Sequence, residues 1–162
     1  MKLSINDKLP NSSFSLIGPT GINRVNLLDL SAGKKIIILG MPGAFTATCT
    51  NEHLPNFINN ANHLFEKGIK EILCIVVNDV YVAKAWDDAM GASKVGIKIL
   101  ADVNSEFTKT VGLAFSAPEV GLFNRMQRVL IVAENSIVTD IKLETKRGVC
   151  DSTSSDSALS II

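Results

Sequence analysis

The sequence lacks any charge imbalance, and this absence argues against several kinds of partner. Sixteen basic residues are matched by sixteen acidic ones across 162 positions. A chain without net charge has no field to attract nucleic acid or an anionic membrane. No run approaches the roughly 18 apolar residues of a membrane span, and residues 1–10 show no secretory signal pattern. We therefore expect a cytoplasmic protein that binds small molecules or other proteins, and neither nucleic acid nor membrane.

Cysteine is also scarce, with only Cys49, Cys74 and Cys150 in the whole chain. An odd count at these wide gaps is a poor disulfide framework for a secreted protein, and it fits no zinc knuckle. We expect a reducing compartment in which any disulfide is transient. No metal ion and no other cofactor are expected.

The sequence does contain buried strands joined by a helix. Residues 35–40 and 71–78 are apolar, β-branched runs, typical of strands covered on both faces. Between them, apolar residues at spacings of three and four predict a helix from Cys49 to Lys67, closed by Gly68 and bent locally by Pro55. Two parallel strands joined in this way form a right-handed βαβ unit.

The flanking segments predict further strands and helices. Strands are expected at residues 13–16, 25–30, 98–101, 128–133 and 137–143. Helices are expected at residues 80–90, 105–111 and, capped by serines, from 152 toward the C-terminus. The first two strands would form an edge hairpin or a loop pair, and the last two an antiparallel hairpin. This is the thioredoxin architecture, so we expect a single α/β domain over residues 1–162 with a thioredoxin-like fold, a central mixed β-sheet flanked by helices.

The join between the first buried strand and its helix is the candidate site. Pro42 and Gly43 break the strand, and Cys49 falls at the start of the helix. Ligands of open α/β sheets bind at this carboxyl edge of the strands. Unpaired backbone N–H groups and the helix dipole favour a thiolate there, whereas a lone cysteine elsewhere is usually a buried hydrophobe. The position therefore predicts that Cys49 is a nucleophile.

The residues before Cys49 suit attack on a peroxide. Thr46 can accept a hydrogen bond from a hydroperoxide or donate one to sulfur. Pro42 has no N–H and can shield the thiolate from water, and Gly43 leaves space for backbone amides to approach a small ligand. Cleavage of a peroxide also needs fixed donors for the charge that grows on the leaving oxygen, and this segment contains no cation.

These residues carry a resemblance to a known family. Pro42-x-x-x-Thr46-x-x-Cys49 resembles the peroxidatic motif of the peroxiredoxins. The longer string over residues 42–50, followed by His53-Leu-Pro55, resembles the type II, peroxiredoxin 5-like branch. Further matches follow in order at residues 77–79, 84–86, 101–102, 106–108 and Arg128. The resemblance implies a thiol-dependent peroxidase that reduces hydrogen peroxide and organic hydroperoxides.

The resemblance also implies the roles of particular residues. Cys49 is the peroxidatic cysteine, Thr46 and Arg128 hydrogen-bond the peroxide oxygens and the thiolate, and Pro42 shields the pocket. Arg128 supplies the missing cation from the start of a strand, while Arg125 is expected in the preceding loop.

Several further residues are candidates for the substrate pocket. His53, one helical turn after Cys49, can face the pocket in a supporting role or act as a general base, and Gly43 is a further pocket candidate. Phe45 and Phe115 would give a small, partly apolar pocket that tolerates organic hydroperoxides. Members of this branch are commonly homodimers, and Phe45 with the expected loop at 114–118 is a candidate dimer contact.

The thiol that closes the reaction cycle stays open at the level of sequence. Attack on peroxide leaves a sulfenic acid that normally condenses with a second thiol. Three routes remain: a disulfide with Cys150, a disulfide with Cys74 after local unfolding, or a one-cysteine cycle. Cys150 is favoured because a loop moves more easily than a central strand, where Cys74 is expected as a packing residue. Thioredoxin, glutaredoxin and glutathione are the candidate reductants.

Two rival functions use the same cysteine. A thiol–disulfide oxidoreductase usually needs Cys-x-x-Cys, but the positions three away from Cys49 hold Thr46 and Glu52. A peroxide sensor or redox-switched interaction protein is the remaining alternative, and such a protein need not turn over with a reductant.

Overall fold

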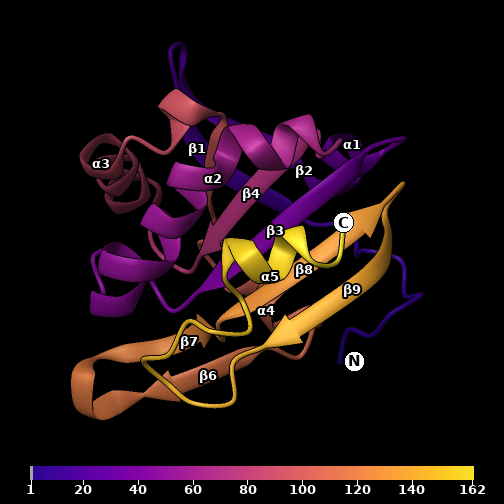
Figure 1. Cartoon of the computed structure of the whole chain (residues 1–162). Helices are drawn as coiled ribbons and strands as arrows, with labels where there is room; N and C mark the ends of the chain where they lie inside the picture. Colours follow the sequence, from indigo (N-terminus) through magenta and orange to yellow (C-terminus); the bar gives the residue numbers. More distant parts are fainter. Residues whose placement is uncertain (1) are drawn as a thin grey trace.

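The structure, a computed structural model, describes residues 2–162 and is built on a seven-stranded mixed sheet (Figure 1). The strand order is β2-β1-β5-β4-β3-β8-β9. Its strands are β1 (Ser13–Gly18), β2 (Gly21–Asn26), β3 (Lys35–Met41), β4 (Glu71–Val76), β5 (Ile97–Ala101), β8 (Val129–Glu134) and β9 (Ile137–Leu143). β3, β4 and β5 are parallel, and the other pairings are antiparallel. The expected central mixed sheet is confirmed.

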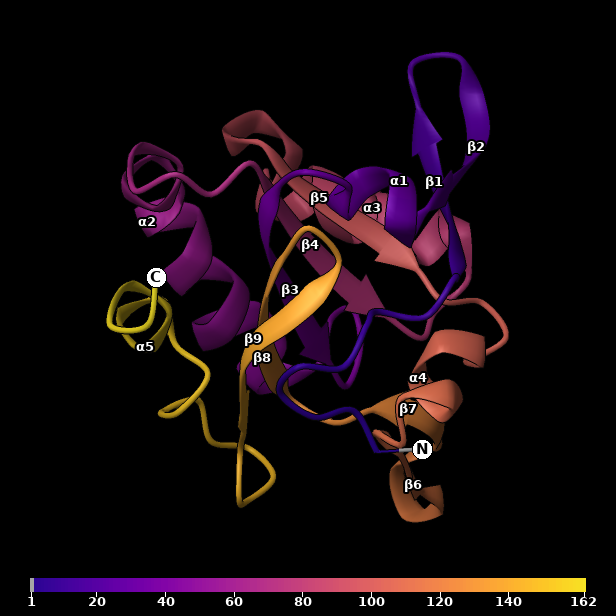
Figure 2. The same cartoon turned by 90° about the vertical axis from the view of Figure 1, so that its right-hand side faces the viewer.

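Helices cover both faces of this sheet (Figure 2). One face packs against α2 (Leu54–Glu66), α3 (Val80–Met90) and α5 (Ser155–Leu159), and the other against α1 (Leu27–Ser31) and α4 (Glu106–Thr110). Alternate residues of β3 enter the two cores: Ile37 and Leu39 face α2, whereas Ile36 and Ile38 face the opposite side. This alternation explains why the whole strand is apolar.

The βαβ unit that carries the candidate site is confirmed, but its helix has two parts. A π-helical segment, η1 (Cys49–His53), precedes α2, and the N–H of Leu54 donates to the carbonyl of Cys49. Pro55 in the first turn of α2 has no N–H to donate. The irregularity expected at Pro55 therefore takes the form of a π-turn. Gly68, at φ +99°, follows the helix as expected.

Two parts of the chain differ from the expectation. Residues 27–30 were expected to continue a strand, but they form α1, because the Asn26 side chain accepts a hydrogen bond from Leu28 N and caps a helix. Residues 114–118 were expected as a loop, yet β6 (Ala114–Ala117) and β7 (Leu122–Met126) form a separate two-stranded sheet. Of the strand residues of this hairpin only Ala117 and Met126 are buried, so it carries no strong apolar pattern.

The remaining predicted elements are confirmed. The hairpins β1–β2 and β8–β9 form as expected, and α3 ends at Gly91 in the left-handed region. Short 3-10 turns, η2 (Ser93–Val95) and η3 (Pro118–Val120), complete the connections. Within residues 2–162, no helix combines the length and the apolar character that crossing a bilayer requires.

Candidate active site

Cys49 lies at the carboxyl end of β3, at the start of η1, and its side chain is completely buried. The N–H of Thr50 donates to the carbonyl of Thr46 at 3.0 Å, so the first helical turn begins just after Thr46. The predicted place of Cys49, in the first turn of a helix after the buried strand, is therefore correct. Backbone N–H groups of this turn lie at the positive end of the helix.

Arg128 brings a cation to the sulfur of Cys49. The residue directly precedes β8, which pairs with β3, and the register opposes Val129 to Gly40 near the end of β3. The Arg128 side chain is only 7% exposed, and its Nη2 donates to Cys49 Sγ at 3.4 Å. A buried guanidinium at this distance stabilises negative charge on sulfur. The structure thus brings together the cysteine and the arginine that the sequence predicted.

The second terminal nitrogen of Arg128, Nη1, contacts His53. Its ring is completely buried, with Nδ1 2.8 Å from Arg128 Nη1 and Nε2 2.9 Å from the carbonyl of Thr153. Arginine only donates, so Nδ1 accepts and Nε2 carries the hydrogen that it donates to Thr153. Burial first, and then the charge of Arg128, lower the pKa of His53 to about 3. The imidazole is therefore neutral near pH 7, and its lone pair is engaged by Arg128, which disfavours the general-base reading.

The loop before Cys49 is fixed by hydrogen bonds. Thr46 Oγ1 donates to the carbonyl of Gly43 at 2.8 Å, so its lone pairs stay available to accept from a hydroperoxide. Of the two roles expected for Thr46, accepting from the substrate fits this geometry, and donating to sulfur does not. The N–H of Ala44 donates to Asn78 Oδ1 at 2.9 Å, which ties the loop to the residues after β4.

The structure differs from the sequence-based expectation at Arg125 and at Gly43. It lies on β7 and not in a loop, and its Nη1 donates to the carbonyl of Pro42 at 3.1 Å. Gly43 was expected to leave room for a ligand. Instead, the Arg125 guanidinium occupies this side, since a Cβ added at Gly43 would lie 2.1 Å from Arg125 Nη1. From the sequence, neither Arg125 nor Asn78 was expected to have a role in holding this loop. The position of Asn78 just after a buried parallel strand was a usable signal, whereas the exposed β7 offered none.

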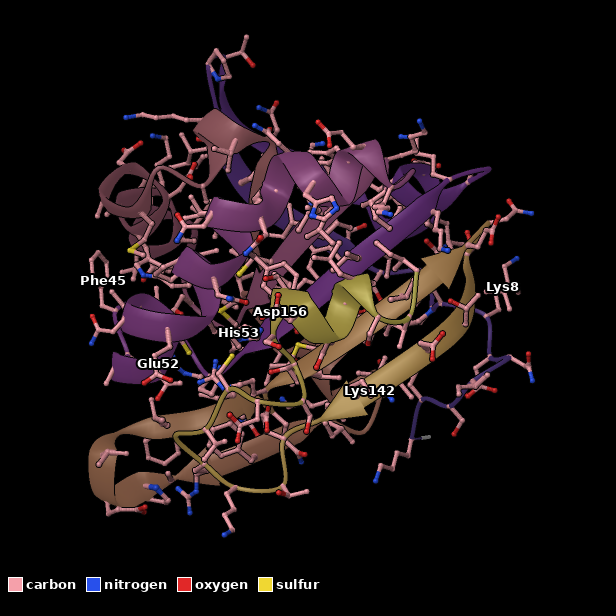
Figure 3. The ribbon with its side chains drawn as sticks, viewed as in Figure 1. Lys8, Phe45, Glu52, His53, Lys142 and Asp156 are labelled. Carbon is pink, nitrogen blue, oxygen red and sulfur yellow. The ribbon has the colours of Figure 1, made fainter. Side chains whose placement is uncertain are left out.

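A cavity of about 400 Å³ opens beside Thr46 and Arg128. Its walls are partly apolar and partly polar: Pro42, Thr46, Ala47, Thr48, Phe115, Ser116, Leu122, Gln127, Arg128 and residues 144–148. Phe115 lies in this wall as expected. Phe45, the other residue expected in the pocket, does not line this cavity; it is 55% exposed, and Figure 3 shows it at the periphery. Its φ of +60° lies in the left-handed region, which non-glycine residues seldom adopt.

The other two cysteines differ in their surroundings. Cys74 is completely buried in β4, between Leu39 of β3 and Ile99 of β5, and burial raises the pKa of its thiol well above the ordinary value. Cys150 is half-buried in the segment after β9, and burial raises the pKa of its thiol as well. All three cysteines are free thiols. Residues 2–162 contain no cluster of three or more side chains suited to a metal ion.

Comparison with known proteins agrees with this fold. The Redoxin family model matches residues 4–159. Peroxiredoxin-2C of Oryza sativa subsp. japonica is 39% identical over 143 residues, with 88% of each chain covered. Peroxiredoxin-2E, chloroplastic, of Arabidopsis thaliana is 39% identical over 158 residues, covering 95% of this chain and 67% of that protein. The chain spans 65% of the length of the rice Peroxiredoxin-2E-2, chloroplastic.

Solved structures give the same result. Reduced Prx3 from Vibrio vulnificus in complex with hydrogen peroxide superposes with a TM-score of 0.91 at 33% identity, covering 98% of both chains. Fold and site together define a thioredoxin-fold protein of the redoxin class, with a buried cysteine at the head of its first long helix. The chain belongs to the peroxiredoxins, in their type II branch.

Proposed function

We propose that the protein is a thiol-dependent peroxidase that reduces hydrogen peroxide and organic hydroperoxides with the Cys49 thiolate. The contact that carries this proposal is the 3.4 Å hydrogen bond from Arg128 Nη2 to Cys49 Sγ. It places a cation on the sulfur beside a cavity of about 400 Å³, large enough for a hydroperoxide with an organic substituent. The apolar part of the wall, which includes Phe115 and Leu122, suits such a substituent.

The chemistry follows from the positions of three side chains. The Cys49 thiolate attacks one peroxide oxygen, the O–O bond breaks, and its electron pair leaves on the other oxygen. That oxygen takes a proton from solvent and departs as water or an alcohol, while the new S–O bond to the attacked oxygen makes Cys49 a sulfenic acid. Arg128 donates to the oxygen on which charge grows, and Thr46 Oγ1 accepts the hydrogen of the peroxide and fixes its orientation.

Cys150 is our choice for the thiol that resolves the sulfenic acid. It is half-buried in the segment between β9 and α5, so it can move without opening the sheet. Cys74 sits in a central strand, and a disulfide with it would break the pairing of β4 with its neighbours. The resulting disulfide, or the sulfenic acid itself in a one-cysteine cycle, is then reduced by thioredoxin, glutaredoxin or glutathione.

The test is steady-state peroxide consumption, coupled in turn to thioredoxin, glutaredoxin and glutathione. We expect Cys49→Ser to abolish turnover with every reductant and Cys74→Ser to retain it. Cys150→Ser should lose turnover with thioredoxin, and full turnover of that variant would exclude Cys150 as the resolving thiol. Oxidation of Cys49 without turnover with any reductant would favour the alternative, a peroxide sensor or redox-switched interaction protein.

We also propose a homodimer in a reducing, cytoplasmic location. Exposed apolar side chains on the loop after β3 and on the β6–β7 hairpin support the dimer: Phe45, Val120 and Phe123 are 55%, 67% and 58% exposed. We expect these exposed apolar side chains to be covered by the second subunit of the dimer. Three free cysteines at wide spacing support the reducing location.

A further inference from the structure

Glu144, the residue directly after β9, organises the segment that carries Cys150. Its backbone N–H donates to the carbonyl of Arg128 at 3.2 Å. Its Oε1 accepts three hydrogen bonds, from Asp151 N at 2.8 Å, Thr153 N at 2.8 Å and Thr153 Oγ1 at 2.9 Å. One carboxylate oxygen therefore fixes residues 151–153 against the strand end beside Arg128.

The same segment docks on the helix that follows Cys49. Figure 1 shows the chain after β9 passing to α5 beside α2, and these two helices are in contact. Asn56 Oδ1 accepts from Ser155 N at 2.6 Å, and Asn60 Nδ2 donates to Ser155 Oγ at 3.0 Å. The carbonyl of Thr153, which is completely buried, accepts from His53 Nε2. His53, Asn56 and Asn60 thus form one polar stripe that holds residues 153–155.

The carbonyl of Thr153 decides which nitrogen of His53 carries the hydrogen. A neutral imidazole has one N–H, and the acceptor at Thr153 keeps it on Nε2. Nδ1 is then left with a lone pair that accepts from Arg128 Nη1, while Nη2 of the same guanidinium reaches Cys49. Without the Thr153 carbonyl, a hydrogen on Nδ1 would face the N–H groups of Arg128 and push the guanidinium away. Burial keeps the ring neutral by lowering the pKa of His53 to about 3.

We propose that Glu144 and His53 are positioning residues of the peroxide site: Glu144 holds Thr153, Thr153 sets the hydrogen of His53, and His53 holds Arg128 against Cys49. This inference rests on the proposed peroxidase function. It assigns the segment after β9 a role in the first chemical step, in addition to carrying the candidate resolving thiol.

The test is the second-order rate constant for hydrogen peroxide with the pre-reduced protein, measured by competition with a haem peroxidase. This step precedes resolution, so it does not depend on which thiol resolves the sulfenic acid. We expect Glu144→Ala to slow it by about tenfold to a hundredfold, the range for a displaced catalytic group. Glu144→Gln keeps an oxygen that accepts all three bonds, and we expect a rate within about twofold of the wild type. Glu134→Ala, at an exposed position on β8, is the matched control.

A second set of variants, made in a His53→Asn protein, distinguishes a positioning role of Glu144 from a general effect on stability. In His53→Asn the amide oxygen still accepts from Arg128 near the place of Nδ1, but the link to Thr153 is gone. If Glu144 acts through His53, adding Glu144→Ala to this background changes the rate by less than about twofold. An equal loss in both backgrounds, or no loss in either, would overturn the proposal. If Glu144→Ala does not fold, Thr153→Val, which removes one bond to Glu144, takes its place, with the same criterion.

The rate of the wild-type protein in the same assay shows whether a failure concerns this proposal or the proposed peroxidase function. A wild type that does not react with peroxide would refute the peroxidase itself. A reactive wild type with additive losses in the double variant would refute only the relay from Glu144 to Arg128.

Discussion

Arg128 is the residue on which the electrostatics of the site depend, because one guanidinium contacts both Cys49 and His53. We expect Arg128→Met to slow reaction with peroxide by about a hundredfold or more, the usual loss when a fixed donor to a developing oxyanion is removed. Arg128→Lys should recover part of this rate, since an ammonium keeps the charge but not the planar fork. Single-turnover oxidation of the reduced protein measures both, with the exposed Arg24→Met as control. Equal rates for all variants would contradict the role of Arg128.

His53 makes stability depend on pH. Its folded-state pKa is about 3 against 6.5 for the free group, so between these values the unfolded chain binds a proton that the folded chain does not. Stability from this group is present above pH 6.5 and is lost as the pH falls toward 3. The loss amounts to about 2 kcal/mol between pH 7 and pH 5.

Urea unfolding at pH 7 and pH 5 under reducing conditions measures this effect. In His53→Gln the difference in unfolding free energy between the two pH values should shrink by about that amount. His63, which is exposed late in α2, provides the control, and His63→Gln should keep the wild-type difference. An unchanged difference in His53→Gln would show that His53 is not held neutral in the folded protein.

The sequence was sufficient to predict which residues come together at the candidate site, but not those that hold them. Cys49, Thr46 and Pro42 lie within one short motif, and Arg128 directly precedes an apolar strand, so these positions can be recognised from the sequence alone. Arg125 and Glu144 act through contacts between segments that are distant along the chain. Such contacts depend on tertiary packing, which no local pattern encodes. Phe45 is 55% exposed and does not line the cavity, which its place in the motif does not reveal.

At the scale of elements, the loop between β3 and η1 is braced from two sides. Arg125 of β7 donates to the carbonyl of Pro42, and Asn78 after β4 accepts from the N–H of Ala44. Gly43 lies under the Arg125 guanidinium. The small β6–β7 hairpin therefore contributes to the site although it lies outside the main sheet.

This brace predicts the effect of a methyl group at Gly43. Gly43→Ala places a Cβ 2.1 Å from Arg125 Nη1, so the guanidinium must move and release Pro42. We expect the peroxide rate to fall by about tenfold, since a loop that positions a nucleophile loses precision. Gly18→Ala is the control, because its Cβ meets only the flexible end of Asn23 at 3.1 Å. A Gly43→Ala protein with the wild-type rate would show that the brace does not matter for the chemistry.

The most deeply buried elements were predictable, whereas the β6–β7 hairpin was not. β3 and β4 are apolar on both faces, and the helices that follow them repeat at three and four residues, so their type is clear from sequence. β6 and β7 lack that pattern because much of their surface faces solvent. The π-turn at Cys49–His53 depends on how the helix accommodates Pro55, which the apolar spacing does not determine.

At the scale of the whole molecule, the exposed apolar side chains predict self-association. We expect the reduced protein to elute as a dimer in size-exclusion chromatography with light scattering. Phe45→Ser should shift it toward monomer, because it removes an apolar side chain that is 55% exposed. Ile22→Ser, at a position 56% exposed on the edge hairpin, is the matched control. A monomer at all concentrations would contradict the proposed dimer without affecting the peroxidase.

The overall arrangement gathers the site from distant parts of the chain. β3 supplies the end at which Cys49 lies, β8 brings Arg128 alongside it, and the segment before α5 returns to contact His53. The central sheet holds these strands in a fixed register, and this register fixes the relative positions of the side chains at the site. The chemistry thus depends on the completed fold and not on the motif alone.

The most direct test of the central claim is to identify which sulfur reacts first. Reduced protein is mixed with one equivalent of hydrogen peroxide in the presence of dimedone, and the labelled peptide is located by mass spectrometry. Dimedone traps the sulfenic acid that attack on peroxide creates. The label is expected on Cys49 and absent from Cys74 and Cys150. A label on either of these other cysteines with Cys49 unmodified would contradict the assignment of Cys49 as the peroxidatic residue.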